Sequence, residues 1–234
     1  MTRRVVWWVF LTATVATVGL IGGSQLEAQS AISADGVVES RSGGFQFPDG
    51  TVQITASCTT VALVEDTGQT TCWDINGNPI TCTGTGMDGE LRAGVAWPTP
   101  RFTDNGDGTA TDNLTGLTWL QDGGCFGNQD WSEAFAEVVA LNAGSRSCAN
   151  YTGTFTDWRL PNIRELLSLV DYGVVNPALP SDNPFLNLSF DNYWTSSTSV
   201  YDVGYAHVVH LGHGLADHGW KPFDANVLPV RGGQ

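Results

Sequence analysis

The sequence contains little charge and almost no lysine. Charged residues make up 15% of its 234 positions, compared with about a quarter in ordinary globular proteins, and Lys221 is the only lysine. Acidic residues outnumber basic residues by 24 to 10, which gives a formal net charge of −14 at pH 7. Such a surface repels polyanions at long range, so we expect no nucleic-acid partner.

Common sequence motifs of enzymes are also missing. The chain contains no G-x-S-x-G and no H-E-x-x-H, and its single lysine is not part of a phosphate-cradling glycine loop. It has no C-x-x-C pair of the kind that often holds a structural metal. These absences favour a binding or structural module over an enzyme.

The first 28 residues have the pattern of a secretory signal peptide. Arg3 and Arg4 precede an apolar run over residues 5–23, and the small residue Ala28 follows in a polar segment. We expect cleavage after Ala28 and a location outside the cell or in the cell envelope, either in the periplasm or on the surface. The alternative is a retained membrane anchor, because the apolar run could nearly span a bilayer.

Residues 29–60 form a short lead-in to the main domain, which we place at 61–234. Two alternating segments, 45–47 and 51–54, flank Pro48-Asp49-Gly50, which is a typical turn sequence, and together they predict a hairpin. A lone hairpin is marginally stable in water, so we expect it to pack on the domain or on neighbouring chains. A homotrimeric stalk is one such arrangement.

The most informative stretch covers residues 157–170 and predicts a short strand followed by a helix. Asn162 is a good N-cap, and Glu165 stands at the position that completes a capping box. The apolar residues recur with helical spacing and predict one buried face. They are Ile163, Leu166, Leu167 and Val170.

A second helix is predicted from Asp130, again with a glutamate at the capping-box position, to about Asn142, with Gly144 as its C-terminal cap. Its expected apolar face comprises Trp131, Ala134, Phe135, Val138 and Val139. Two helices facing small sheets indicate one α+β core, and 41% hydrophobic residues suffice to fill it. We expect Trp119, Trp158 and Trp194 to lie in that core; the alternative is that they are platforms on which sugars stack.

Short strands are predicted within residues 101–121, near 193–198, near 205–211 and near 227–231, with a long loop over 176–192. Loops of this length are uncommon without a function. Arg159 and Arg231 would be buried, paired structural arginines if the ends of the domain lie close together.

Three ordered motifs give the chain a family resemblance: DWRLPNIRELLSLVD from Asp157, NYWTSS from Asn192 and PVRGG from Pro229. With the upstream sequence, residues 67–233 resemble the Lcl C-terminal domain family. The resemblance implies a disulfide-stapled, C-type-lectin-like α+β module of secreted or surface proteins, with two short helices on small antiparallel sheets. The best-known namesake is an adhesin domain that binds sulphated polysaccharides.

The five cysteines are Cys58, Cys72, Cys82, Cys125 and Cys148. In an exported chain they indicate disulfides, but the sequence allows several pairings. Proximity together with the family resemblance favours Cys72–Cys82 and Cys125–Cys148, which leaves Cys58 over. C-type-lectin-like folds include formylglycine-generating oxidoreductases with catalytic cysteines or metal, so an enzyme of that kind is the catalytic alternative.

All four histidines lie within residues 207–218, in a predicted hairpin. His207 and His210 would point to opposite faces of a strand, while His213 lies in a turn and His218 begins the return. The expected ligand-contacting residues are these four, Asn183 of the long loop, and Asp217. We expect no resident cofactor; the alternatives are zinc at His207, His210 and His213 and calcium at Asp104, Asp107 and Asp112.

The sequence thus predicts an exported, non-catalytic, adhesin-like recognition module for a polysaccharide or another cell-surface ligand. The high acidity weakens the case for a sulphated ligand. The alternative is a structural role, as the trimerising head of a surface protein.

Overall fold

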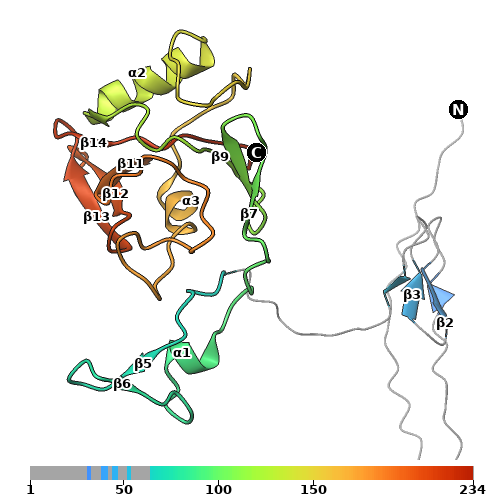
Figure 1. Cartoon of the computed structure of the whole chain (residues 1–234). Helices are drawn as coiled ribbons and strands as arrows, with labels where there is room; N and C mark the ends of the chain where they lie inside the picture. The colour runs from blue at the N-terminus through green and yellow to red at the C-terminus, as the bar shows by residue number, and fades with distance from the viewer. Residues whose placement is uncertain (1–30, 33–37, 42–43, 47–51, 54–63, 234) are drawn as a thin grey trace, which may run out of the picture. The chain divides into compact units, whose positions relative to one another are not determined.

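The computed structural model describes residues 31–32, 38–41, 44–46, 52–53 and 64–233 and divides the chain into two units, 1–59 and 60–234. The first unit contains an antiparallel sheet of four short strands in sequence order (Figure 1): β1 (Ala31–Ile32), β2 (Val38–Arg41), β3 (Gly44–Gln46) and β4 (Val52–Gln53). Phe45 pairs with Gln53, so the predicted hairpin is present. The expected signal peptide and Cys58 lie outside the described residues.

A five-stranded sheet forms the centre of the second unit. Its strands run in the order β10 (Asn128–Gln129), β14 (Ala225–Asn226), β11 (Asn192–Thr198), β12 (Tyr205–His210) and β13 (Leu215–Trp220). All neighbours are antiparallel except β11 and β14. Because β13 pairs along its whole length with β12, the histidine-containing segment is a true two-stranded hairpin.

A four-stranded sheet lies beside α3 in the same unit (Figure 1). Its order is β15 (Val230–Arg231), β9 (Thr118–Leu120), β8 (Thr109–Asp112) and β7 (Phe102–Asp104). The predicted meander over residues 101–121 is therefore confirmed. The last strand returns to this sheet, where Val230 pairs with Trp119.

Helix α2 (Trp131–Asn142) begins with the predicted capping box, in which Asp130 accepts from the amide of Glu133 and the Glu133 side chain accepts from the amide of Asp130. Gly144 follows its end with a positive φ of 69°, a conformation that glycine adopts without strain. Ala134 and Val138 are buried, as predicted. The expectation for Phe135 and Val139 was wrong, because the helix covers the sheet with a narrower face than its apolar residues would allow and leaves both exposed.

Helix α3 (Ile163–Leu167) also has its predicted capping box, between Asn162 and Glu165. Leu166 and Val170 are buried, and Ile163 and Leu167 pack partly buried against the same core. This core fills the space between α3, the four-stranded sheet and one face of the five-stranded sheet (Figure 1). Apolar burial of this kind stabilises the fold by about 25 cal/mol per Å².

A second hydrophobic cluster lies between α2 and the opposite face of the five-stranded sheet. It contains Trp158 and Trp194, while Trp119 belongs to the cluster around α3. All three tryptophans are no more than 3% exposed, so the prediction that they form the core is confirmed. None of them is available as a platform for a ligand.

The structural arginines differ from the prediction. Arg159 binds Glu165 through two contacts of 2.7 Å, and Arg231 binds Asp157 at 2.7 Å, but both arginines remain about a quarter exposed because they lie at the edge of the domain. The fully buried ion pair instead joins Arg101, 2% exposed, to Asp112. Arg101 Nη2 also donates to the carbonyl of Ser168, which ties the residue just before β7 to the residue that ends α3.

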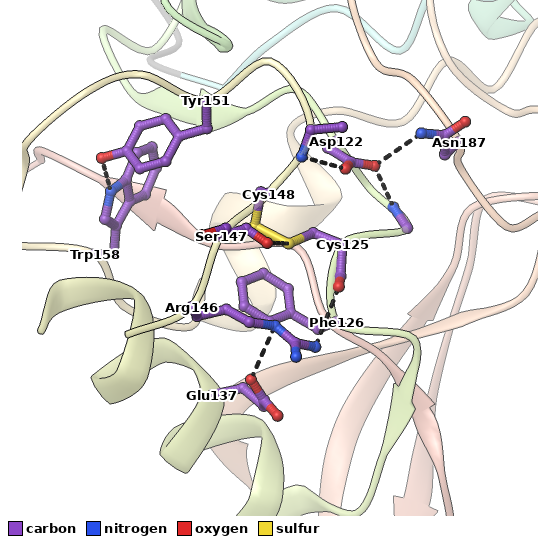
Figure 2. Close-up of a disulfide and its surroundings, with 12 residues drawn as sticks. Asp122, Cys125, Phe126, Glu137, Arg146, Ser147, Cys148, Tyr151, Trp158 and Asn187 are labelled. Carbon is purple, nitrogen blue, oxygen red and sulfur yellow. Dashed lines mark hydrogen bonds and ion pairs between the residues drawn. A yellow bond between two sulfur atoms is a disulfide. The ribbon is translucent and has the colours of Figure 1, made fainter. Parts of the chain in front are cut away.

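Both predicted disulfides are present, Cys72–Cys82 and Cys125–Cys148. The first closes a small hairpin of β5 (Cys72–Trp73) and β6 (Pro79–Ile80) next to α1 (Asp88–Leu91), a short helix that the sequence analysis did not predict. The second joins the loop between β9 and β10 to the chain that follows α2 (Figure 2).

The long loop over 176–192 is fixed to the domain along much of its course. Asp122 accepts from the side-chain amide of Asn187 and from the backbone amide of Ala149, so one buried carboxylate joins three segments near the second disulfide (Figure 2). Ala178 and Leu179 are buried in the core. Over the described ranges, the helices are too short or too polar to cross a bilayer.

Candidate functional site

One face of the β12–β13 hairpin carries a row of partly exposed rings. Tyr205 stands opposite Trp220 and His207 opposite His218, and in an antiparallel pair residues that stand opposite each other share a face. The Tyr205 and His218 rings meet edge to face with centroids 5.3 Å apart. Phe223 extends the row through an edge contact with Trp220 at 5.0 Å. We call these five residues the hairpin strip.

The strip lies at an edge of the five-stranded sheet, because among the described residues no strand pairs with the outer side of β13. The side chain of His218 is 51% exposed, Trp220 is 44% exposed and Phe223 is 63% exposed. Large aromatic side chains are usually buried, and a group of them at the surface marks an interaction site more often than a random feature. The preceding loop adds the exposed Tyr201.

The other two histidines form a separate pair. His210 and His213 stack with ring centroids 4.4 Å apart and an angle of 4° between the rings. Nδ1 of His210 accepts a hydrogen bond from the amide of His213, which holds the turn between β12 and β13. Because His207 and His210 are three positions apart on a strand, they point to opposite faces as predicted, and the structure does not bring all four histidines together.

The remaining predicted site residues have local structural contacts. Asn183 donates to the carbonyl of Pro180 and accepts from the amide of Phe185, so its side-chain amide holds the loop. Asp217 is exposed and accepts from the amide of His218. It stands opposite Val208, on the face away from the hairpin strip.

The carboxylates considered for calcium are also used locally. Asp104 accepts from the amide of Gly106, and Asp107 accepts from the amide and hydroxyl of Thr109. Asp112 is buried against Arg101. Across the described part of the chain, no three His, Cys, Asp or Glu side chains are arranged to hold a metal ion.

Basic side chains near the hairpin are already engaged. The ammonium group of Lys221 lies over the ring of Trp131 at 4.0 Å and donates to the hydroxyl of Thr198. The side chain of Lys221 therefore points toward α2, while Trp220 next to it belongs to the strip. A polyanion would find no free lysine here.

Trp220 and Phe223 were missed by the sequence analysis. The segment Leu215–Trp220 does not alternate between apolar and polar residues, because β13 is an edge strand that is exposed along nearly its whole length. The available signal was Trp220 itself, a large aromatic residue between a glycine and the only lysine, at a place where no apolar pattern would bury it.

These features define a disulfide-stapled α+β domain with several small sheets, few helices and an aromatic surface at a sheet edge. A sequence model for the Lcl C-terminal domain matches residues 108–231. The chain therefore belongs to the Lcl C-terminal domain family. The match begins just before β8, yet β7 completes the same sheet, so the folded unit extends beyond the matched region. No curated protein shows significant sequence similarity to the chain.

Proposed function

We propose that this protein is an exported, non-catalytic recognition module of C-type-lectin-like architecture, and that its hairpin strip contacts a polysaccharide or another cell-surface ligand. The observation that carries the proposal is the row of exposed rings on one face of β12 and β13. Trp and Tyr combine a large apolar surface with a polar group, and such residues dominate the energetics of many binding surfaces.

Charge supports an uncharged ligand over a sulphated one. The chain has a net charge of −14, its lysine is held against Trp131, and Arg101, Arg159 and Arg231 are each paired with a carboxylate. A sulphated chain would have to overcome long-range repulsion without a free basic cluster at the strip. We therefore propose that the ligand carries no sulphate groups.

The cysteines support a binding role over the catalytic alternative. Four of the five form two disulfides, so they are not available as the free thiols that a formylglycine-generating type of chemistry uses. The bridges also agree with export, because disulfides persist mainly in oxidising compartments.

A glycan-array screen of residues 29–234, run with calcium, with zinc and with a chelator, tests the proposal. We expect saturable binding to uncharged glycans that is lost in the His207→Ala/His218→Ala double variant. The His210→Ala/His213→Ala variant is the matched control, because it also removes two histidine side chains from the same hairpin, but away from the hairpin strip. Loss in the control alone would place the ligand elsewhere.

A folded protein that binds nothing on the array under all three conditions would refute the polysaccharide ligand and leave a protein partner or the structural alternative. Light scattering after size-exclusion chromatography then examines the structural alternative, because a trimerising head would give a mass of three chains that depends on concentration.

A further inference from the structure

A cleft of about 500 Å³ shares no lining residue with the hairpin and lies where the segment before β7 meets the turn after α3 and the start of the long loop. Its walls include Asp66, Trp97, Arg101, Asp171 and Asp182. We call it the Trp97 cleft. None of the residues predicted from the sequence to bind a ligand contributes to it.

Three carboxylates reach the cleft from three different segments, and each is held by a backbone amide. Asp66 accepts from Gly68 at 2.7 Å, and Asp171 accepts from Gly173 at 2.7 Å. Asp182 accepts from the amide of Arg101 at 3.1 Å. Each carboxylate offers about four lone-pair positions, so these bonds fix the orientation of the groups without using up their acceptor capacity.

Arg101 supplies an unused donor in the same wall. Its Nε and Nη2 atoms bind Asp112, yet Nη1 has no hydrogen-bond partner within residues 64–233, although the residue is only 2% exposed. A buried, unpaired donor is costly, and in native proteins most buried donors have an acceptor. The guanidinium also lies 4.9 Å from the centre of the Trp97 ring.

The electrostatics of the cleft disfavour anions. Burial raises the pKa of the Asp171 carboxyl above its ordinary value; the amide of Gly173 opposes this shift, and the charge of Asp66 adds to it. Arg92 lies 3.9 Å from Asp66, but it is 57% exposed and contributes a screened charge. An acidic ligand would add a further negative charge beside the three carboxylates of the cleft.

From this arrangement we infer that the Trp97 cleft is a binding site for a neutral saccharide residue. Sugar hydroxyls both donate and accept, so they satisfy fixed carboxylates and the free Arg101 Nη1 at the same time, and the apolar face of a sugar ring packs against Trp97. A bare cation would leave Nη1 without an acceptor. This site is separate from the hairpin strip and does not depend on it.

The test is saturation-transfer NMR of the exported protein with the methyl glycosides of glucose, galactose and N-acetylglucosamine. At least one glycoside should bind saturably, and glucuronic acid should bind at least roughly tenfold more weakly. Trp97→Ala should abolish binding, and Asp171→Asn should weaken it at least roughly fivefold, since a hydrogen bond to a charged group is lost. Asp104→Asn is the matched control, because Asp104 makes the same turn with Gly106 outside the cleft.

Asp171→Asn keeps the test decisive if Trp97→Ala does not fold, because asparagine can make the same turn contact. Binding that survives Asp171→Asn but disappears in His207→Ala/His218→Ala would overturn the cleft site while supporting the strip. Binding that is lost in Asp171→Asn but retained in His207→Ala/His218→Ala would support the cleft as the site for the glycoside and exclude the strip. Absence of binding by all three glycosides, or tight binding of calcium alone, would overturn the inference.

Discussion

Removing the carboxylate of Asp112 should destabilise the domain more than removing any exposed carboxylate. Asp112 is fully buried and accepts four hydrogen bonds, from Arg101 Nε at 2.7 Å, from Arg101 Nη2 at 3.1 Å, from the amide of Leu114 at 2.9 Å and from the hydroxyl of Thr115 at 2.7 Å. In Asp112→Ala the Arg101 charge stays buried without a counter-charge. Breaking such a pair from one side costs about 3–5 kcal/mol.

Urea unfolding followed by tryptophan fluorescence measures this loss. With a urea slope of about 2 kcal/mol per molar, the midpoint should fall by roughly 1.5–2.5 M. Asp157→Ala is the control, because it also removes an aspartate from an arginine, Arg231, but at an exposed position, where the loss is about 0–1 kcal/mol. Equal midpoints for the two variants would refute the claim that the buried Arg101–Asp112 pair stabilises the domain.

Three further changes give distinct outcomes in the same unfolding assay. Glu165→Gln should cost about 1–2 kcal/mol at pH 7, since the ion pair is lost and the cap is kept. Burial opposes ionisation of Glu165, but Arg159 and the Asn162 amide lower its pKa below 4.5 on folding. This stability is therefore present above pH 4.5, and the variant and the wild type should converge as the pH falls through the lowered pKa. Replacing Cys125 and Cys148 with alanine should cost roughly 3 kcal/mol. Reducing the wild type should cost at least as much, because it breaks Cys72–Cys82 as well. Gly219→Ala should cost about 1–3 kcal/mol, because the added methyl would lie 2.8 Å from the Trp194 ring, and an unchanged midpoint would contradict that packing.

Features set by neighbouring residues were readable from the sequence. Both capping boxes form as predicted because each depends on residues three positions apart, Asp130 with Glu133 and Asn162 with Glu165. The tryptophans of the core were identified from their apolar neighbours. The disulfides followed from proximity and the family resemblance.

Features set by distant contacts were not readable. Arg101 and Asp112 are buried together only because β7 and β8 pair under α3, and neither residue has an apolar pattern that signals burial. Arg159 and Arg231 do have apolar neighbours in the sequence, but their side chains lie at the edge of the domain and stay about a quarter exposed. Likewise, Trp220 became part of the candidate site because of the β12–β13 register, which places it opposite Tyr205.

The pairing of residues 225–231 has a consequence for how the protein is made. Within this short segment β14 lies between β10 and β11, and β15 pairs with β9, so both larger sheets lack a strand until these residues are available. A nascent chain cannot finish either sheet while residues 225–231 remain inside the ribosomal tunnel. Translation therefore leaves both larger sheets incomplete until this segment emerges, so the final packing of the domain waits for the last strands.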